Sequence, residues 1–271
     1  MMITSSANPT IKQIRKLRDR KERQQSGLFY AEGLRIVIEA AHQNAPIQTL
    51  VTAPDLLTSE QGIKEIQDLR RRGVEVLEVS ESVFKSLALK EDPQGIAAVV
   101  AQSWQALEQV HLQEGDLWVA LEEVADPGNL GTILRTCDGA GARGVILLDH
   151  ATDPYDPTAM RASMGAIFTQ KLVKTDLDRF SAWVKAGGVP LIGTSGAARL
   201  DYHDFPYPQR FVLLMGSERQ GLSEKAMGIC DQVVSIPMVG HSDSLNLAVA
   251  TAVVLYEVYN CRRDVRMEGK K

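Results

Sequence analysis

The sequence has few of the residues that mark secreted, metal-binding or membrane proteins. Its 271 residues include only three cysteines, Cys137, Cys230 and Cys261, and no C-x-x-C pair. Neither a disulfide framework nor a zinc site is therefore expected. No stretch approaches the roughly 20 apolar residues of a membrane span, and the N-terminus lacks the charged and apolar segments of a signal peptide. We expect a soluble, unexported protein of the reducing cytoplasm that binds no metal.

Two widespread motifs for cofactor binding and catalysis are also missing from the positions where they would act. No G-x-G-x-x-G follows an expected strand, which disfavours a Rossmann fold and a nicotinamide cofactor. No G-x-S-x-G elbow is present either, because residues 193–196 read G-T-S-G, the wrong spacing for a hydrolase nucleophile. The hydrophobic share of 44% nevertheless suits one large or two modest domains with real cores.

The net charge of −4 argues at first against a nucleic-acid partner. Its distribution argues the other way, because residues 1–25 carry seven basic and two acidic side chains, a local excess of five. This cluster favours contact with RNA phosphates over a merely solvated helix face, with Lys12, Arg15 and Lys16 as the candidate residues. For the basic C-terminal tail, a solvated segment is the favoured interpretation.

Residues 1–102 alternate short apolar runs with helical patterns, as in a small α/β domain. Asn8 and the proline after it are typical of a helix N-cap and first position. Ile11, Ile14 and Leu17 then form a narrow apolar stripe, which predicts that this helix docks weakly. Strands are expected over 28–31, 47–52, 74–79 and 95–101, and helices over 34–41 and 59–71.

Residues 103–115 show no strong periodicity and are interpreted as a linker, and 116–271 are interpreted as a second α/β domain. Continuous apolar strands such as 145–148 are typical of a parallel sheet that is covered on both faces. Strands are expected over 117–122, 144–148, 171–174, 190–194, 211–215 and 233–237, and helices over 130–139, 159–168, 177–186 and 245–262.

Three polar clusters in the second domain carry the functional signal. They are N-x-G-x-x-x-R at 129–135, G-S-E-x-x-G-L at 216–222 and S-L-N-L at 244–247. Each is expected at a junction between a strand and a helix, where side chains and free backbone amides face the carboxyl edge of an α/β sheet and bind ligands. Three such loops in one order are a far more specific signal than any one of them alone.

In this order the loops resemble the SpoU (TrmH-type) branch of the SPOUT RNA methyltransferases. The resemblance implies S-adenosylmethionine-dependent transfer of a methyl group to a ribose 2′-hydroxyl, in 23S rRNA. It also implies a deep trefoil knot between about residue 190 and the end of the chain, and a homodimer whose paired C-terminal regions complete each active site. Part of the apolar face of the last helix is expected to form the dimer interface.

The front domain also carries a resemblance. Residues 29–35, F-Y-A-E-G-L-R, and 93–96, P-Q-G-I, are similar to the substrate-binding domain that many SpoU enzymes carry in front of the catalytic domain. That domain resembles RNA-binding proteins of the large ribosomal subunit. Arg35, in the first of these stretches, and Arg161, in a helix rich in small residues similar to one found in relatives, are further candidates for RNA contact.

The resemblance assigns roles to individual residues. Arg135 is the residue proposed to activate the 2′-hydroxyl. Because a guanidinium is effectively never deprotonated in proteins, we assign Arg135 instead to positioning the ribose phosphate and stabilising developing negative charge. Asn129 holds the first loop, Glu218 supports the loops rather than acting as a base, and Ser244 and Asn246 lie near the reacting hydroxyl. The cofactor-binding candidates are Thr194, Ser195, Gly196, Leu214, Gly216, Ile236 and Leu245.

Simpler structural and functional interpretations stay open. Asn129 and Ser244 are good N-cap residues, and Glu218 suits the N-terminus of the helix that follows it. In function, the alternatives are a tRNA 2′-O-methyltransferase and a catalytically silent RNA-binding or ribosome-assembly protein on the same fold. The front domain favours rRNA over tRNA, and the complete set of five polar residues argues against a protein that only binds.

Overall fold

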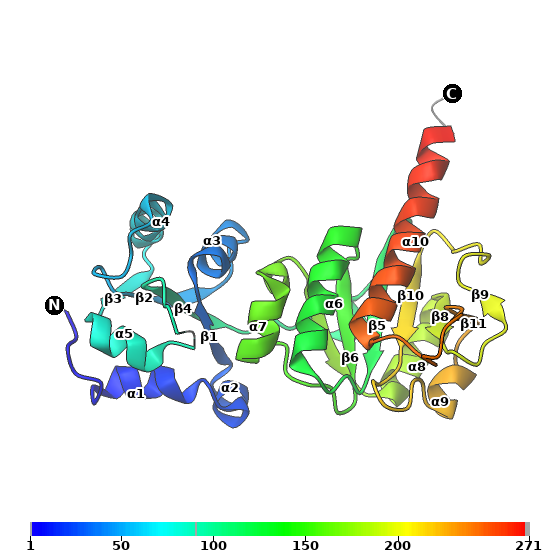
Figure 1. Ribbon diagram of the computed structural model, residues 1–271, viewed down its shortest axis with the longest axis horizontal. Coiled ribbons are helices and arrows are strands. Elements are labelled where there is room, and N and C mark those ends of the chain that lie inside the picture. Colours follow the sequence, from blue (N-terminus) through cyan, green and yellow to red (C-terminus); the bar gives the residue numbers. More distant parts are fainter. Residues whose placement is uncertain (1, 90, 269–271) are drawn as a thin grey trace. The chain divides into compact units, whose positions relative to one another are not determined.

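The chain divides into two compact units in the computed structural model, which describes residues 2–89 and 91–268 (Figure 1). Unit 1 contains the residues up to Gln102 together with Tyr155–Thr169. Unit 2 contains Ser103–Pro154 together with the residues from Gln170 onward. The segment 103–115, expected as a linker, thus groups with unit 2, and 155–169 groups with unit 1.

Unit 1 is built on a mixed four-stranded sheet with the order β1-β4-β2-β3. Strand β4 is antiparallel to both of its neighbours, and β2 and β3 are parallel. All four strands lie close to their predicted positions, because each contains apolar residues typical of strands and is bounded by turn residues. The strands are β1 (Leu28–Glu32), β2 (Ile47–Thr52), β3 (Glu75–Glu78) and β4 (Ile96–Ala101). The helices of this unit that precede Gln102 are α1 (Pro9–Lys16), α2 (Arg20–Ser26), α3 (Leu34–His42), α4 (Glu60–Arg71) and α5 (Glu81–Leu87).

Helix α1 begins as predicted but docks much more firmly than expected. The Asn8 side chain accepts a hydrogen bond from the Thr10 amide, and proline occupies the first turn. Ile11, Ile14 and Leu17 are only 0%, 6% and 6% exposed and share a core cluster with residues of α5. The prediction of weak docking is therefore wrong. Helix α5, which has only two turns, was not predicted, although it provides the surface that covers the stripe.

Unit 2 contains a seven-stranded sheet in the order β7-β6-β5-β10-β8-β11-β9, and all of its strand pairs are parallel. The predicted parallel sheet is confirmed. The two-residue strand β9 was not foreseen, because it is too short to show a pattern. The strands are β5 (Leu117–Glu122), β6 (Gly144–Leu148), β7 (Lys171–Thr175), β8 (Leu191–Thr194), β9 (Leu200–Asp201), β10 (Phe211–Met215) and β11 (Gln232–Ser235).

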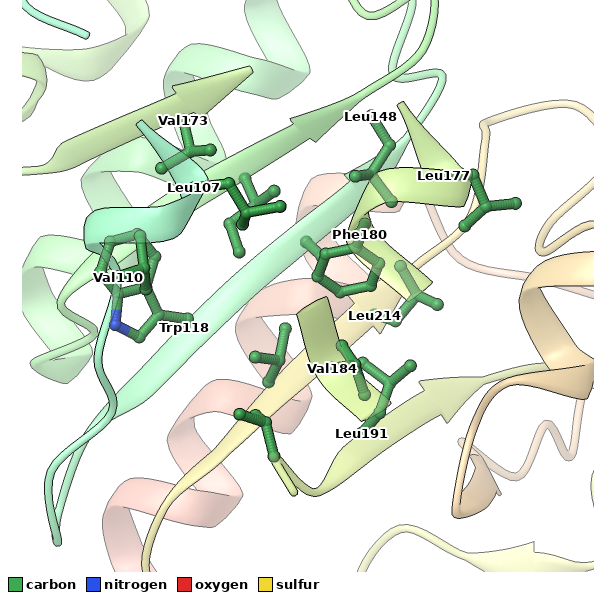
Figure 2. Packing of buried hydrophobic residues seen from close by; sticks show 14 of the residues in the cluster. Leu107, Val110, Trp118, Leu148, Val173, Leu177, Phe180, Val184, Leu191 and Leu214 are labelled. Atoms are coloured by element: carbon green, nitrogen blue, oxygen red, sulfur yellow. The ribbon is translucent and has the colours of Figure 1, made fainter. Parts of the chain in front are cut away.

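Helices cover both faces of this sheet. Helices α6 (Pro127–Ala140) and α10 (Leu247–Glu268) pack against each other, as Figure 1 shows. Helix α8 (Leu177–Gly187), α9 (Glu224–Gly228) and the short 3-10 helix η1 (Leu107–Gln109) contribute to one continuous core cluster. In this cluster Phe180 of α8 lies among Leu148, Val184 and Leu214 (Figure 2). Leu107 of η1 is buried there too, so the segment 103–115 packs on the sheet instead of hanging free.

Several predicted helices have different bounds in the structure; α6, for example, begins at Pro127 rather than at 130. The helix expected over 159–168 is split into α7 (Pro157–Ser163) and the 3-10 helix η2 (Ala166–Phe168). Met164 and Gly165 between them have φ angles of 53° and 98°, a conformation that interrupts a right-handed helix and favours glycine. The last helix begins at Leu247 rather than 245. No helix within residues 2–89 and 91–268 is both long and apolar enough to cross a membrane.

Candidate active site

Four loops of unit 2 meet at one edge of the sheet. They follow β5, β10, β8 and β11, which are neighbours in that order. Because the strands are parallel, their carboxyl ends lie at the same edge. The chain runs outward from β5 to β6 and β7 and then resumes on the other side of β5. Such reversal points are the usual ligand-binding sites of open α/β sheets.

Glu218 joins the loop after β10 to the loop after β5. Its Oε2 accepts a hydrogen bond from the Ala125 amide at 3.1 Å, and its Oε1 accepts one from the Asp126 amide at 3.1 Å. Oε1 also accepts from Asn129 Nδ2 at 3.1 Å. The carboxylate therefore holds the entrance to α6. It does not cap α9, because the N-cap of that helix is Ser223.

These hydrogen bonds decide the charge state of Glu218. Partial burial by itself would raise the pKa of its carboxyl group, because burial disfavours the charged form. The donors on Ala125, Asp126 and Asn129 outweigh burial and hold the pKa below its usual value. Glu218 is thus an ionised anchor that accepts hydrogen bonds, and this agrees with a supporting role rather than that of a base.

Asn129 and Asn246 extend the link to the loop after β11. Asn129 Oδ1 accepts a hydrogen bond from Asn246 Nδ2 at 3.0 Å. Asn246 Oδ1 in turn accepts from the amides of Ala248 and Val249 at 2.9 and 3.3 Å. Both side chains donate with nitrogen and accept with oxygen, which a carboxylate cannot do. One polar residue from each motif, Glu218, Asn129 and Asn246, therefore belongs to one chain of hydrogen bonds.

The helix caps differ from the simple structural interpretation of the motifs. Asp126, not Asn129, caps α6, because its Oδ1 accepts from the Asn129 amide at 2.7 Å. Asn246, not Ser244, provides the capping oxygen for the first turn of α10. The Ser244 hydroxyl lies within 3.4 Å of Asp243 Oδ1, to which it donates. Ser244 is thus an exposed loop residue with no capping role.

A first cavity, of about 310 Å³, lies among the loops after β8, β10 and β11. Leu214, one of the seven cofactor-binding candidates, does not line it, because its side chain is fully buried in the core beside α8. Successive side chains of a strand point to opposite faces, and the next residue, Met215, lines the cavity instead. The six candidates that do line it are Thr194, Ser195, Gly196, Gly216, Ile236 and Leu245.

A second, more open cavity of about 530 Å³ adjoins the first. The two cavities share Glu218, Ser244, Leu245 and Leu247 as lining residues. Asn129 and Asn246 line only the second. Four of the five candidate catalytic residues therefore surround this space, together with Asp126.

Arg135 lies apart from the other candidates. It is exposed on α6 and lines neither cavity. It forms no hydrogen bond or ion pair with any residue that the structure describes. Within one chain, the structure does not bring its guanidinium together with the Glu218, Asn129 and Asn246 chain of hydrogen bonds.

The RNA-contact candidates all lie in unit 1. Lys12 and Lys16 are exposed on α1, and Arg35 is exposed on α3. Arg15 is partly committed to the fold, because its Nη2 donates to Ser86 Oγ at 2.9 Å. Arg161 on α7 makes a long hydrogen bond of 3.4 Å to Thr158 Oγ1.

Part of the basic cluster has a structural role that the sequence did not reveal. Arg18 Nη2 donates to the carbonyl oxygens of residues 86–88, at the end of α5, over 2.9 to 3.2 Å. Arg23 is 1% exposed and lies 3.5 Å from the carboxylate of Asp156. These arginines stabilise unit 1, so fewer than seven basic side chains face solvent.

Sequence reasoning missed several residues of the site. Glu122, at the end of β5, is 6% exposed and accepts hydrogen bonds from the Ser223 amide at 2.9 Å and hydroxyl at 2.6 Å. It thereby fixes the far end of the loop after β10. A carboxylate closing an apolar strand was the available signal. Met215 and Asp243, which line the first cavity, adjoin the motifs without belonging to them.

Gly216 is required by the tight loop after β10. Ser217 and Gly221 exchange backbone hydrogen bonds of 3.0 and 3.1 Å, and a Cβ at 216 would overlap the Gly221 carbonyl carbon and the Leu222 amide nitrogen. We expect Gly216→Ala to lower the free energy of unfolding by about 1–3 kcal/mol, as overpacking does, measured by urea unfolding. Gly196→Ala is the matched control, since its Cβ would meet Asp243 O at 3.8 Å and should change stability by less than about 0.5 kcal/mol. Equal stability of both variants would contradict this account of the loop.

Metal ligands are not gathered at the site. Within residues 2–89 and 91–268, no group of three or more His, Cys, Asp or Glu side chains is arranged to hold a metal ion. Cys137 and Cys230 are free thiols, and burial raises the pKa of the Cys230 thiol to about 12. The polar side chains that line the first cavity are carboxylates, hydroxyls, the amide of Gln220 and the guanidinium of Arg219.

Comparison with known proteins identifies the family of each part of the chain. Residues 116–256 match the model of the SpoU rRNA Methylase family, and residues 8–98 match that of the MRM3-like substrate binding domain. A crystal structure of an AdoMet-bound rRNA methyltransferase from Sinorhizobium meliloti superimposes with a TM-score of 0.88 at 38% identity, covering 95% of this chain and 96% of that one.

Two relatives match nearly the whole chain. One is the 23S rRNA (uridine(2479)-2′-O)-methyltransferase of Streptomyces viridochromogenes, 33% identical over 91% of this chain and 87% of that protein. The other is the 23S rRNA (guanosine(2553)-2′-O)-methyltransferase RlmP of Bacillus subtilis, 31% identical over 94% of this chain and 98% of that protein. The chain, with its three loops joined through Glu218, Asn129 and Asn246, therefore belongs to the SpoU rRNA methylase family.

Proposed function

We propose that this protein is an S-adenosylmethionine-dependent RNA methyltransferase that modifies a ribose 2′-hydroxyl in 23S rRNA. The observation that carries the proposal is the hydrogen-bonded chain from Glu218 through Asn129 to Asn246, which lies between two adjoining cavities. One cavity suits a cofactor and the other a nucleotide. The two relatives that match along nearly the whole chain are both named 23S rRNA 2′-O-methyltransferases.

The first cavity fits S-adenosylmethionine in size and chemistry. Its volume of about 310 Å³ falls within the range of about 300–1,000 Å³ typical of small-molecule sites. Met215, Ile236 and Leu247 offer an apolar surface to a purine ring. Asp243 and Glu218 also line the cavity, and their carboxylates complement the positive charges of a sulfonium and an amino group.

The residues of this chain have distinct tasks in the proposed reaction. When bound, S-adenosylmethionine supplies an electrophilic methyl group. Asn129 and Asn246 join the two loops that flank the nucleotide cavity, and Glu218 fixes the loop of Asn129 to the loop after β10. Ser244, exposed where the two cavities meet, contacts the ribose. This arrangement fixes the donor and the hydroxyl in one geometry, which is a large source of rate acceleration in group transfer.

Arg135 enters the proposed site from a second copy of the chain. Its absence from both cavities supports a homodimer in which α6 and α10 form a two-fold interface. Helix α10 packs on α6 and carries Val249, Tyr256 and Tyr259, which are 49%, 47% and 41% exposed. In such a dimer the arginine of one protomer positions the ribose phosphate at the partner's cavity. The trefoil knot implied by the family resemblance and the cytoplasmic location expected from the composition likewise remain predictions.

The rRNA substrate is preferred to tRNA because both full-length relatives act on 23S rRNA by name. A silent RNA-binding protein is disfavoured because it would not need amides at both 129 and 246. The target nucleotide stays open, since the two relatives modify a uridine and a guanosine at nearly equal identity to this chain. Mapping ribose methylation in total RNA from cells with and without the protein tests the proposal. One 23S rRNA position should lose its methyl group, whereas loss at a tRNA position, or at none, would contradict it.

Calorimetry should separate the proposed cofactor from a nicotinamide cofactor. We expect S-adenosylmethionine and its demethylated product to bind with measurable heat, and NAD to give none, because no glycine-rich pyrophosphate loop is present. Binding of NAD without any response to either adenosyl ligand would overturn the assignment of the first cavity.

We further propose that RNA binds unit 1 through Lys12, Lys16, Arg35 and Arg161, with Arg15 contributing less. Lys12 and Lys16 are exposed one turn apart on α1 and form no ion pair with a described residue. Arg15 is less available to RNA because its side chain donates a hydrogen bond to Ser86 Oγ. Deleting residues 1–25 cannot test the proposal, because it would remove Ile11 and Ile14 from the core of unit 1.

Charge substitutions give a cleaner test of this RNA surface. We expect the pair Lys12→Ala and Lys16→Ala to weaken binding of a structured rRNA fragment. The slope of log K against log salt concentration should become shallower by about 0.7 to 0.9 for each phosphate that the variant no longer neutralises. Lys185→Ala, an exposed lysine on α8, is the matched control and should leave the slope unchanged. If α1 is only a solvated helix, all three slopes will be equal.

A further inference from the structure

The second cavity is lined by two carboxylates, Asp126 and Glu218, and they differ in their remaining capacity. Both oxygens of Glu218 accept hydrogen bonds from the protein, one from Ala125 and the other from Asp126 and Asn129. Only Oδ1 of Asp126 is engaged, by the Asn129 amide at 2.7 Å. Within the described residues, Asp126 Oδ2 has no partner. Asp126 is exposed and lines the second cavity, so this oxygen is accessible from it.

The other polar groups around the second cavity are less suited than Asp126 to accept the proton of a bound hydroxyl. The side-chain oxygens of Asn129 and Asn246 accept hydrogen bonds from Asn246 Nδ2 and from the first amides of α10, and an amide oxygen takes up no proton at neutral pH. The Ser244 hydroxyl points its hydrogen toward Asp243. An arginine only donates. Of the two described carboxylates that line this cavity, Asp126 is therefore the one with an oxygen that no protein donor engages.

We propose that Asp126 is the catalytic residue that binds the ribose 2′-hydroxyl and receives its proton. This inference rests on the proposed methyl transfer. A lone pair of the hydroxyl oxygen forms the new bond to the methyl carbon, and the electron pair of the breaking sulfur–carbon bond stays on sulfur. The oxygen gains positive charge as the new bond forms, so its proton becomes acidic enough to pass to a carboxylate. The Asn129 amide holds Asp126 in place through Oδ1 and leaves Oδ2 for the substrate.

The fold gives a reason for placing an aspartate rather than another cap at this position. Ser, Thr, Asn and Asp all cap helices well, so capping α6 does not by itself need a carboxylate. The cap is also fixed from behind, because Glu218 accepts from the backbone amide of Asp126 at 3.1 Å. The side chain is thus positioned at both its backbone and its Oδ1, as a group that must meet a substrate atom should be.

Asp126→Asn separates the proposed role from capping. Asparagine keeps an oxygen for the Asn129 amide and has the same shape, but an amide accepts no proton at neutral pH. We expect turnover to fall at least about 10²-fold, while the melting temperature and the calorimetric affinity for S-adenosylmethionine stay near those of the wild type. Asp126→Ser, which keeps only a short capping hydroxyl, should show the same loss. Wild-type turnover in either variant would overturn the proposal.

A binding measurement tests the contact without any turnover. Two rRNA fragments carry ribose or 2′-deoxyribose at the nucleotide mapped in cells, and each is titrated with the protein in the presence of the demethylated cofactor product. Wild-type protein should prefer ribose by about 10- to 100-fold, as a hydrogen bond to a charged group implies. Asp126→Ser should bind both fragments equally. An unchanged preference in the variant would show that Asp126 does not touch the hydroxyl.

The two levels of the proposal fail in different ways. If wild-type protein transfers no methyl group to any RNA, the proposed function is wrong. If wild-type protein methylates a ribose and Asp126→Asn does so at the same rate, only the role of Asp126 is wrong.

Discussion

Arg135→Ala is expected to lower turnover by at least about 10²-fold, the loss that follows removal of a group that stabilises transition-state charge. The affinity for S-adenosylmethionine should hardly change, because Arg135 lines neither cavity of its own chain. Single-turnover methylation of an rRNA fragment and calorimetry measure the two quantities. Arg135→Lys keeps the charge but loses the planar array of donors, so it should recover only part of the rate. An alanine variant with full activity would remove Arg135 from the mechanism.

Mixing two inactive variants tests whether Arg135 acts across a dimer interface. Arg135→Ala is combined with Asn129→Asp, which replaces the donor amide that faces Glu218 with a second carboxylate. If the arginine serves the partner's cavity, each mixed dimer has one site with neither defect. Random exchange of equal amounts should then restore about a quarter of wild-type activity. No recovery after proven subunit exchange would place Arg135 in its own protomer's site or outside the mechanism.

Glu218→Ala is expected to lower turnover by about 10²-fold or more and to weaken cofactor binding as well. The variant leaves the amides of Ala125 and Asp126 and the side chain of Asn129 without their acceptor. The loops of both cavities would then shift relative to each other, and a displacement of about 1 Å can cost this much. Glu218→Gln should not rescue the loss, because its NH₂ group would face an amide that also donates. Normal cofactor affinity in both variants would contradict the anchoring role.

Because the pKa of Glu218 is lowered in the folded state, its contribution to the free energy of unfolding depends on pH. The folded state favours the ionised carboxylate, so the stabilisation is fully present above the ordinary glutamate value of about 4.3. It is lost as the pH falls through the lower value of the folded state. The difference in free energy of unfolding between wild type and Glu218→Gln should therefore be constant from pH 7 to about pH 5 and shrink below about pH 4. If this difference in free energy of unfolding instead grew on acidification, the pKa of Glu218 would not be lowered in the folded state.

Features that depend on a local pattern could be predicted from the amino-acid sequence. Continuous apolar runs located nearly every strand of both sheets, since a strand buried on both faces needs no partner information to be recognised. The helix cap at Asn8 could be predicted because it involves only the Asn8 side chain and a backbone amide close to it in the sequence. The three motif loops could also be recognised from the sequence, because each has particular residue types at fixed spacing after a strand. Their order alone indicated the SpoU family.

Which of these residues meet depends on the tertiary structure. Glu218 binds amides 92 and 93 residues earlier in the chain, a contact set by the placement of β10 beside β5. With β10 in this position, the side chain of Leu214 lies in the core and that of Met215 lines the first cavity. The packing of α5 against α1 determines how firmly α1 docks. The backbone conformation at Gly165 divides into α7 and η2 a segment that the sequence pattern predicted to be one helix. Arg135, correctly placed on its helix by the motif, was left outside the cavities of its own chain. Strand order and side-chain partners arise from contacts between distant segments, and no local pattern encodes them.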